Sequence, residues 1–228
     1  GVNAIVSPET TIQLSQLRAL APDGRCKTFD ADADGYARGE GCGVLVLTTA
    51  STAQRRGWTV RAVVAGSAVN HDGPSAGLTV PSGDAQEQVL SAALADGGID
   101  PSTVGYLEAH GTGTRLGDPI ELQGIKAVYG DRQQPIRVGS IKTNIGHLEA
   151  GAGVAGVIKA VLALQHQQVP PHTNLNTLNP ALPLDFPVDI NTEPVPLTER
   201  RAAVSSFGLS GTNAHVILEA ASPVEQAA

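Results

Sequence analysis

Apolar positions along the chain follow two different spacings. Apolar residues three and four positions apart predict helices at residues 8–20, 84–95, 118–128 and 151–165. A further brief helix is predicted at residues 51–56, before Gly57. Short apolar runs bounded by turn residues predict strands at residues 44–47, 60–69, 104–107, 136–141, 203–207 and 214–218. Helices and strands alternate until two strands close the chain, so the pattern predicts an α/β layered sheet covered by helices.

Turn chemistry sets the expected ends of several elements. Gly57 and the pair Gly97–Gly98 follow predicted helices, and glycine commonly ends a helix. Asp118 precedes Pro119, which predicts an N-cap followed by the first helical residue. Loops are expected where glycine, serine or proline accumulate, at residues 70–81 and 170–200.

The composition narrows the class of protein. Hydrophobic residues make up 41% and aromatic residues only 3%, so the core must consist mainly of Val, Leu, Ile and Ala. The formal net charge is −7, and no basic cluster exceeds the pairs Arg55–Arg56 and Arg200–Arg201, which argues against a nucleic-acid partner. No apolar run approaches the ~20 residues of a membrane-spanning helix. Two cysteines without close spacing fit a reducing cytoplasm.

The start of the chain has the character of the middle of a domain. Gly1 opens an apolar stretch typical of the end of a buried strand, and no methionine occurs among the 228 residues. A secretory signal would need positive charge near the start, which residues 1–6 lack. We therefore expect this chain to be a fragment of a larger domain.

Two stretches place chemically versatile side chains directly after predicted strands. His110 follows the strand at 104–107 and precedes Gly-Thr-Gly-Thr, where glycines let the backbone turn sharply and pass close to a ligand. Lys142 and His147 follow the next predicted strand, at 136–141. Because both stretches begin just past a strand, the sequence predicts one site at one edge of one sheet.

Metal-binding patterns are incomplete. Asp30, Asp32 and Asp34 imitate the start of a calcium-binding loop, but position twelve of that loop is Gly41 instead of glutamate, which favours a solvated acidic loop. Zinc-type spacing is also missing, so we expect no metal site. The four residues considered as zinc ligands are His110, His147, Cys26 and Cys42.

The stretch GAGVAG at residues 151–156 matches the glycine pattern of dinucleotide-binding loops. In such loops the first glycine comes directly after a strand, and an acidic residue follows about 20 positions later. Neither condition holds here, so the glycines instead predict a helix that lies close against a sheet.

Five stretches resemble the β-ketoacyl synthase domain of type I modular polyketide synthases. They are EAHGTGT (108–114), KTNIGHLE (142–149), SSFGLSGTNAH (205–215), DADADGYARGEGCG (30–43) and RLGDPIE (115–121). The resemblance implies a thiolase-like α-β-α-β-α layered sandwich. Residues 1–219 look like its C-terminal half, and residues 220–228 look like the start of a post-ketosynthase linker. The family's nucleophilic cysteine, in a Thr-Ala-Cys-Ser-Ser context, is absent from this chain.

The resemblance implies catalytic roles for three residues. Two histidines of the family converge on the thioester oxygen of a malonyl group, and His110 and His147 match them. Lys142 matches a buried cation beside them, and Glu149 is the expected carboxylate partner of Lys142. Neutral imidazole N–H groups stabilise negative charge that develops on such an oxygen.

The resemblance also implies how substrate is held. Thr112 and Thr114 match positions that hydrogen-bond the amides of pantetheine. Leu209 matches the family's gating residue, and its backbone N–H is expected to share an oxyanion hole with that of the absent cysteine. The other residues expected in this turn are Phe207, Gly208 and, as its brace, Asn213.

The implied reaction is a decarboxylative Claisen condensation of an acyl-enzyme with a malonyl-type acyl carrier protein. The chain would then be part of an acyltransferase, inactive as this fragment alone. No bound cofactor is expected, because the substrates travel on the phosphopantetheine of the carrier protein. The implied partners are the N-terminal half of the ketosynthase domain, the carrier protein, a second copy in a homodimer and an adjacent acyltransferase domain, with neither nucleic acid nor membrane, in the cytoplasm.

Two alternatives stay open. A non-catalytic, chain-length-factor-like domain would shape an interface, but it has no need of His110, Lys142 and His147 together. A fatty acid synthase ketosynthase would perform the same chemistry. However, RLGDP (115–119) and SGTNAHVILE (210–219) look more like modular polyketide synthases.

Overall fold

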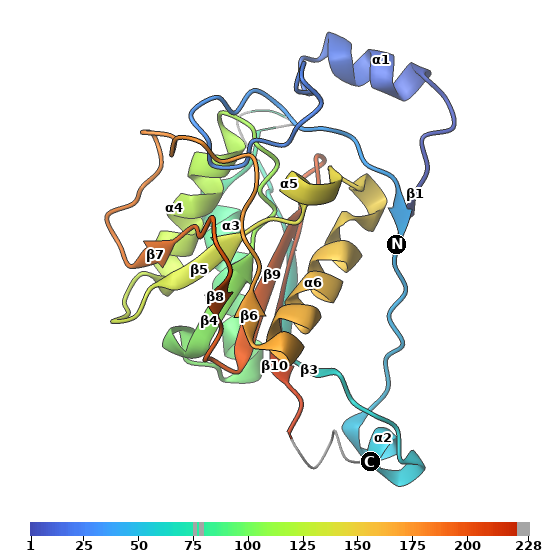
Figure 1. Ribbon diagram of the computed structural model, residues 1–228, viewed down its shortest axis with the longest axis vertical. Coiled ribbons are helices and arrows are strands. Elements are labelled where there is room, and N and C mark those ends of the chain that lie inside the picture. Colours follow the sequence, from blue (N-terminus) through green and yellow to red (C-terminus); the bar gives the residue numbers. More distant parts are fainter. Residues whose placement is uncertain (75–76, 78–79, 223–228) are drawn as a thin grey trace.

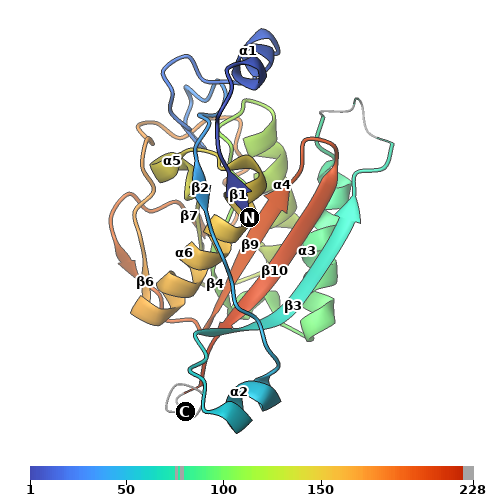
Figure 2. The same ribbon diagram turned by 90° about the vertical axis from the view of Figure 1, so that its right-hand side faces the viewer.

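A mixed six-stranded sheet forms the centre of the molecule. The computed structural model describes residues 1–74, 77 and 80–222. The strand order is β3-β10-β9-β4-β5-β7 (Figures 1 and 2). The strands are β3 (Ala62–His71), β10 (Thr212–Ala220), β9 (Arg201–Phe207), β4 (Val104–Glu108), β5 (Ile136–Gly139) and β7 (Val188–Asp189).

Strand direction brings three strand ends to one edge of this sheet. β4 runs parallel to β9 on one side and to β5 on the other, whereas β10 is antiparallel to both of its neighbours. In the register, Glu108 lies opposite both Gly139 and Val204. The carboxyl ends of β4, β5 and β9 therefore meet at the same edge, which is where ligands bind in open α/β sheets.

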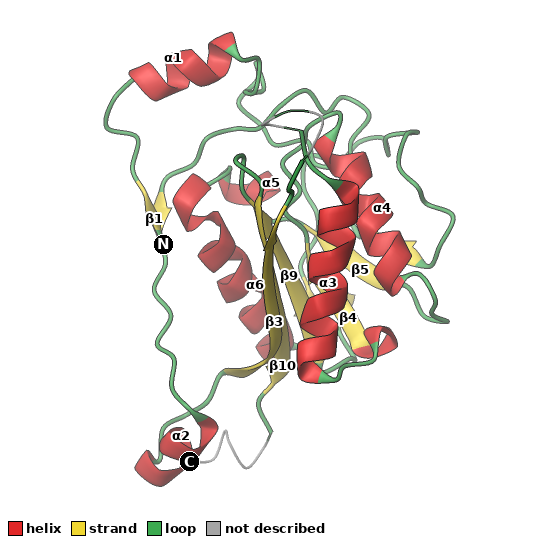
Figure 3. Cartoon of the chain, turned by 180° about the vertical axis from the view of Figure 1, so that it is seen from behind, coloured by secondary structure: helices red, strands yellow, loops and turns green. Residues whose placement is uncertain are grey.

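Helices cover both faces of the sheet. α6 (Ala152–His166) lies on one face, and α3 (Gly83–Gly97) and α4 (Gly117–Tyr129) lie on the other (Figures 1 and 3). Side chains of β4 alternate between the two cores, with Leu107 on the α3–α4 side and Tyr106 on the α6 side. All five residues of β4 are buried, as expected for a parallel strand covered on both faces.

The glycines of the 151–156 stretch allow α6 to approach the sheet, as the sequence predicted. A Cβ atom on Gly156 would lie 3.1 Å from Glu108 Cγ and 3.1 Å from Val204 Cγ1, which leaves almost no room for a side chain. The helix is not buried all round, because Leu162 on its outer side is 47% exposed. α6 is therefore a covering helix with one apolar face on the sheet.

Local signals placed several helix ends correctly. α2 (Ala50–Arg56) ends at Gly57, which adopts the left-handed conformation with φ 63°. α3 begins after Ser82, whose side chain accepts a hydrogen bond from the Ala85 N–H, and it ends at Gly98 with φ 59°. A left-handed residue after the last turn is the usual glycine role at a helix end.

The predicted end of the first helix and the predicted N-cap of the helix at 118–128 are wrong. α1 (Glu9–Gln16) is shorter than the predicted 8–20, because the chain turns at Arg18, which has φ 53°. Asp118 is not the N-cap of α4, since the helix already includes Gly117. The Asp118 carboxylate instead accepts hydrogen bonds from backbone N–H groups outside the helix, which competes with a capping role.

The predicted buried strand at 44–47 is also wrong. The pairing nearby is between β1 (Val2–Asn3) and β2 (Gly41–Cys42), and the chain then runs in an extended form toward α2 (Figure 3). Val44 is 77% exposed and Val46 is 91% exposed. Within the described residues no strand lies alongside this stretch, so most of its apolar side chains stay exposed.

The predicted loops contain short elements. The covering loop at 170–200 includes β7 and β8 (Val195–Pro196), and β8 pairs with β6 (Gln168–Val169). Elsewhere in the chain, three short helices connect the longer elements: η1 (Pro101–Thr103), α5 (Lys142–Ile145) and η2 (Glu149–Gly151).

The predicted linker at 220–228 lies outside the described residues from 223 on, as do parts of the loop at 70–81. In the part of the chain that is described, no helix is long and apolar enough to cross a membrane.

A buried chain of polar side chains ties α4 to the sheet. Tyr129 Oη lies 2.9 Å from His215 Nε2, and Ser205 Oγ lies 3.0 Å from His215 Nδ1. His215 is fully buried, and burial lowers its pKa to about 3. The imidazole is therefore neutral at neutral pH, with a hydroxyl on each ring nitrogen.

We expect acid to destabilise the fold through His215. The unfolded chain binds a proton near pH 6.5 and the folded chain only near its pKa of about 3. The free energy of unfolding therefore falls as pH drops below about 6.5, by up to about 1.4 kcal/mol per pH unit. In a complete domain containing this segment, His215→Gln should lose less stability than the parent between about pH 7 and about pH 5.

Urea denaturation at the two pH values measures this difference. Other buried histidines contribute equally to the parent and to the variant, so their effects cancel in the comparison. His166→Gln is the matched control, because His166 is exposed at the end of α6 and should leave the pH dependence unchanged. An equal loss of stability in the parent and in His215→Gln would contradict the prediction.

Candidate active site

The three parallel strand ends carry the predicted catalytic residues. His110 stands two residues after β4, and Lys142 begins α5 three residues after β5. Phe207 is the last residue of β9. α5 lies at that edge of the sheet (Figure 1). The structure thus brings these residues to one edge of one sheet.

The structure also brings His110 and His147 together. Their ring centroids are 5.4 Å apart and the rings are almost perpendicular, with an interplanar angle of 84°. Phe207 packs against His110 at 5.6 Å, and Tyr36 packs against His147 at 5.1 Å. The two imidazoles thus share one small space that aromatic rings border on both sides.

Backbone amides fix the same tautomer in both histidines. The Phe207 N–H donates to His110 Nδ1 at 3.3 Å, and the Glu149 N–H donates to His147 Nδ1 at 2.9 Å. A nitrogen that accepts a hydrogen bond carries no hydrogen in the neutral ring, so the hydrogen of each ring is on Nε2. Each imidazole therefore offers one N–H donor to a ligand.

Both rings are neutral at physiological pH. Burial and, next, the charge on Lys142 lower the pKa of His110 well below its usual value. The same two causes, in the same order, lower the pKa of His147 to about 3. A neutral pair of donors is the arrangement that stabilises an oxyanion without binding a carboxylate.

A buried carboxylate holds the loop that follows β4. Glu121 Oε1 accepts from the His110 N–H at 2.7 Å, and Glu121 Oε2 accepts from the Gly111 N–H at 2.8 Å. Burial raises the pKa of Glu121 to about 7, although those two N–H groups and the charge on Lys142 stabilise its ionised form. Glu121 fixes the backbone of His110 from the first turns of α4.

Asp118 holds the next part of the same loop. Its carboxylate accepts from the N–H groups of Phe29, at 2.8 Å, and Gly113, at 3.1 Å. Burial raises its pKa to about 6, against the effect of these bonds. Sequence reasoning gave neither Asp118 nor Glu121 a role in the site, although both lie in the recognised stretch RLGDPIE.

Lys142 is buried, and the expected ion pair with Glu149 is wrong. Among the described residues no carboxylate oxygen lies within ion-pairing distance of Lys142 Nζ. Burial lowers the pKa of Lys142, and the charges on Glu108 and Glu121 oppose that shift. Glu149 instead pairs with Arg38. Glu149 was expected beside Lys142 because it lies in the same recognised stretch, but its backbone is left-handed, with φ 46°, and its carboxylate lies against Arg38.

Glu108 joins β4, α5 and α6 through one carboxylate. Oε2 lies 2.8 Å from Lys159 Nζ and also accepts from the Tyr106 hydroxyl. Oε1 accepts from the Ile141 N–H at 2.5 Å, directly before Lys142. The sequence signal for this pair was present, since Lys159 is the only charged residue in the apolar helix at 151–165.

The turn after β9 contains a backbone donor without an acceptor among the described residues. The Leu209 N–H donates no hydrogen bond within the described residues, and its side chain is 65% exposed. Gly208 and Gly211 close the turn through a 2.9 Å hydrogen bond between their backbones. Asn213 donates to Asn70 Oδ1 at 3.1 Å and to a second side chain of the adjacent strand end, Asp72, at 2.7 Å.

The two loop threonines lie side by side. Thr112 Oγ1 and Thr114 Oγ1 are 3.3 Å apart, and Thr114 Oγ1 also accepts from the Gly117 N–H at 3.2 Å. Both side chains are half-buried. Their hydroxyl groups keep hydrogen-bonding capacity for a ligand, because each oxygen accepts twice and donates once.

The two cysteines differ in environment. Cys26 is buried, its Sγ accepts from the Ala37 N–H at 3.2 Å, and burial raises its pKa. Cys42 is exposed on β2. A catalytic thiol needs a lowered pKa, so Cys26 has the wrong environment for that role.

The acidic loop after Cys26 is partly buried. Asp30 accepts from the N–H groups of Asp32, at 2.8 Å, and Asn176, at 2.6 Å, so it caps turns as predicted but is not solvated. No group of three or more potential ligands in the described part of the chain is arranged to hold a metal ion.

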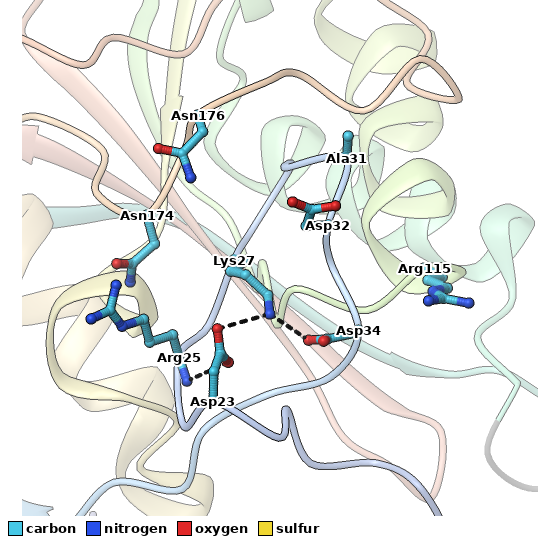
Figure 4. Close-up of a pocket in the computed structure, with 9 residues that line it drawn as sticks. All are labelled: Asp23, Arg25, Lys27, Ala31, Asp32, Asp34, Arg115, Asn174 and Asn176. Atoms are coloured by element: carbon cyan, nitrogen blue, oxygen red, sulfur yellow. Dashed lines mark hydrogen bonds and ion pairs between the residues drawn. The ribbon is translucent and has the colours of Figure 1, made fainter.

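A cavity of about 590 Å³ opens beside this acidic loop (Figure 4). Lys27 Nζ lies inside it, 3.0 Å from Asp23 and 2.9 Å from Asp34. The lining residues are Asp23, Arg25, Lys27, Ala31, Asp32, Asp34, Arg115, Asn174 and Asn176. Its acidic and basic side chains are equal in number, and none of the site histidines lines it.

Three family models match this chain along its length. The β-ketoacyl synthase C-terminal domain matches residues 61–176, and the β-ketoacyl synthase N-terminal domain matches residues 1–53. The ketoacyl-synthetase C-terminal extension matches residues 179–228. The chain therefore belongs to the β-ketoacyl synthase family, and it includes sequence from both of the family's domains.

Its curated relatives are polyketide synthase subunits. One of the phenolphthiocerol/phthiocerol polyketide synthase subunits of Mycobacterium tuberculosis (strain CDC 1551 / Oshkosh) is 51% identical over 235 residues, which cover 100% of this chain and 12% of that protein. Another of these subunits from the same strain is 52% identical over 224 residues, which cover 96% of this chain and 15% of that protein. The chain thus spans a small part of the length of these relatives.

Solved structures with the same fold are ketosynthases. The ketosynthase from module 6 of the bacillaene synthase from Bacillus subtilis 168 has a TM-score of 0.94 at 39% identity, covering 97% of this chain and 42% of that chain. The oxazolomycin ketosynthase domain of Streptomyces albus JA3453 has a TM-score of 0.94 at 42% identity. The match covers 98% of this chain and 41% of that chain. The predicted thiolase-like α/β fold is confirmed, and a modular polyketide synthase is favoured over both alternatives.

Proposed function

We propose that this chain forms part of a ketosynthase that condenses a cysteine-bound acyl group with a malonyl-type unit on an acyl carrier protein. One observation carries the proposal. The ring centroids of His110 and His147 lie 5.4 Å apart, and each ring has its Nδ1 occupied by a backbone N–H. Two Nε2–H donors are therefore available for one oxygen.

The chemistry explains why neutral donors are needed. Decarboxylation breaks the bond between the malonyl α-carbon and its carboxylate, and the electron pair moves into an enolate centred on the thioester oxygen. Two positioned N–H groups stabilise that charge as it develops. Lys142 adds positive potential to the site without pairing with a side-chain carboxylate. The enolate carbon then attacks the acyl thioester, and the cysteine thiolate leaves.

The remaining roles are assigned by family position. We propose that Thr112 and Thr114 hydrogen-bond the amides of phosphopantetheine, which arrives on the carrier protein, so no separate cofactor is bound. The Leu209 N–H contributes to the oxyanion hole for the acyl thioester, and Asn213 braces the turn that carries it. Phe207 and Gly208 complete the gate in front of the histidines.

The nucleophile is proposed to come from the N-terminal half of the ketosynthase. Neither Cys26 nor Cys42 has the Thr-Ala-Cys-Ser-Ser context of the family. Residues 1–228 by themselves should therefore form no acyl-enzyme. A homodimer, an adjacent acyltransferase domain, a cytoplasmic location, and the domain bounds 1–219 and 220–228 stay predictions from the family resemblance.

The test uses a complete ketosynthase that contains this segment. Single-turnover acylation of cysteine and release of labelled carbon dioxide from malonyl-carrier protein are measured on the same preparation. A condensing ketosynthase should show both cysteine acylation and carbon dioxide release, whereas a chain-length-factor-like domain should show no cysteine acylation. Changing each histidine in turn then separates the two steps.

We expect Leu209→Trp to slow loading of long acyl chains more than loading of acetyl. The turn at residues 208–211 has glycines at both ends, and Gly211 adopts φ 93°, so its backbone has room to shift as a chain enters. A bulkier side chain narrows that entry for long chains. Acylation rates with acetyl and with long-chain thioesters are compared, with Leu162→Trp on the exposed side of α6 as the control. Equal slowing for both chain lengths would remove the gating role.

A further inference from the structure

His147 is held by a second segment of the chain, residues 37–39. The His147 N–H donates to the Ala37 carbonyl oxygen at 2.7 Å, and the Gly39 N–H donates to the His147 carbonyl oxygen at 2.9 Å. Arg38 therefore lies directly opposite His147 in a short parallel pairing. Gly146 allows this close approach, since a Cβ there would lie 3.1 Å from the Ala37 oxygen.

The side chain of Arg38 reaches over the same turn. Its Nε lies 2.6 Å from Glu149 Oε1, and its Nη2 lies 3.0 Å from Glu149 Oε2, so the contact is bidentate. Nη1 donates to Thr11 Oγ1 in α1 at 2.7 Å. The side chain of Arg38 is 9% exposed and that of Glu149 is 27% exposed. Partial shielding and the two-point geometry make such a pair stronger than an ordinary surface ion pair.

The backbone of Glu149 is in a conformation that needs support. Glu149 has φ 46°, in the left-handed region that side-chain-bearing residues rarely adopt. That conformation is sterically unfavourable for a residue with a Cβ, because the Cβ comes too close to the following carbonyl oxygen. It aims the Glu149 N–H at His147 Nδ1, 2.9 Å away. The ion pair with Arg38 is the contact that holds the Glu149 side chain in place.

We propose that Arg38 and Glu149 are positioning residues for His147. The pair fixes the left-handed turn at Glu149, so that its N–H occupies His147 Nδ1 and keeps the ring hydrogen on Nε2. Neither side chain touches substrate in this role. The inference rests on the proposed function, because the Nε2–H matters only if His147 is a donor to the enolate oxygen.

The experiment compares variants of Glu149 in a complete ketosynthase. We expect Glu149→Ala to lower carbon dioxide release from malonyl-carrier protein by about tenfold or more, because small misplacements of a catalytic group cost up to about a hundredfold. Acylation of cysteine should stay within about twofold. Glu149→Gln keeps a hydrogen bond to Arg38 and should retain more activity. Glu149→Gly should also be less impaired than the alanine variant, since glycine adopts positive φ without strain.

A second readout reports on the ring itself. Nitrogen-15 NMR of labelled histidine distinguishes a ring nitrogen with hydrogen from one without. The parent should show His147 Nδ1 without hydrogen, and Glu149→Ala should show a mixture of tautomers. Glu219→Ala is the matched control, because Glu219 forms an ion pair with Arg201 at 2.8 Å, on strands β10 and β9. It should change neither readout.

The outcomes separate the positioning role from the proposed function. If Glu149→Ala keeps parental carbon dioxide release and tautomer, the positioning role is wrong even when thermal stability falls. If acylation and decarboxylation fall equally, the pair supports the fold as a whole and the inference is again wrong. His147→Ala, measured alongside, tests the proposed function independently, since it should lose decarboxylation whatever the outcome for Glu149.

Discussion

Replacing His110 or His147 by alanine should remove decarboxylation from a complete ketosynthase while leaving acylation of its cysteine largely intact. Each substitution deletes one of two Nε2–H donors to the enolate oxygen. Loss of one donor from an oxyanion site costs about 3 kcal/mol, or on the order of a hundredfold to a thousandfold in rate. In the proposed function, the charge of cysteine acylation develops elsewhere, at an oxyanion hole to which the Leu209 N–H contributes.

The two rates are measured on the same preparations, as single-turnover acylation and as labelled carbon dioxide release. His166→Ala is the control, because that histidine is exposed at the far end of α6 and should behave like the parent in both assays. His110→Asn is informative beside His110→Ala, since an amide can restore one donor. Decarboxylation within a few-fold of the parent in both alanine variants would reduce the two histidines to a structural role.

Removing the Glu108 carboxylate should destabilise the same domain by about 3–5 kcal/mol, the usual cost of breaking a buried ion pair on one side. Glu108 is 1% exposed, and its loss leaves Lys159, whose side chain is only 11% exposed, without its carboxylate. The Tyr106 hydroxyl and the Ile141 N–H lose their acceptor at the same time. Because Ile141 precedes Lys142, we expect the start of α5 to loosen as well.

Urea unfolding of Glu108→Ala, Lys159→Met and the double variant measures this prediction. The double variant should be more stable than Glu108→Ala, because no unpaired charge remains. Glu219→Ala removes a partly exposed ion pair and should cost about 1 kcal/mol or less. A cost for Glu108→Ala no larger than that of Glu219→Ala would contradict the importance of the buried pair.

Much of the fold could be predicted from local patterns. The helix that ends at Gly57 and the strand that leads to His110 follow from spacing and turn residues, which record how a short stretch is buried. The stretch at 44–47 shows where this fails. Its apolar run predicts a buried strand, yet Val46 is 91% exposed, because burial depends on a neighbour that a local pattern cannot contain.

The sequence singled out residues that the structure brings together, but it did not predict their partners. His110 and His147 do lie together, because both follow parallel strands that end at one edge. The expected pairing of Lys142 with Glu149 is wrong, and Glu149 pairs with Arg38, which is 111 positions away in the chain. No spacing rule connects residues at that separation.

By itself, then, the sequence determined the order of helices and strands, the loops that follow them, and the residue types gathered at one sheet edge. Only the tertiary structure decided which backbone N–H occupies each imidazole, and which carboxylates balance Lys142. Element order follows from local periodicity and turn chemistry, which act over a few residues. The tautomer of His110 depends on Phe207, and the ion pair of Glu149 depends on Arg38. Both contacts join residues far apart in the chain over about 3 Å, and they exist only after the sheet and its helices have packed.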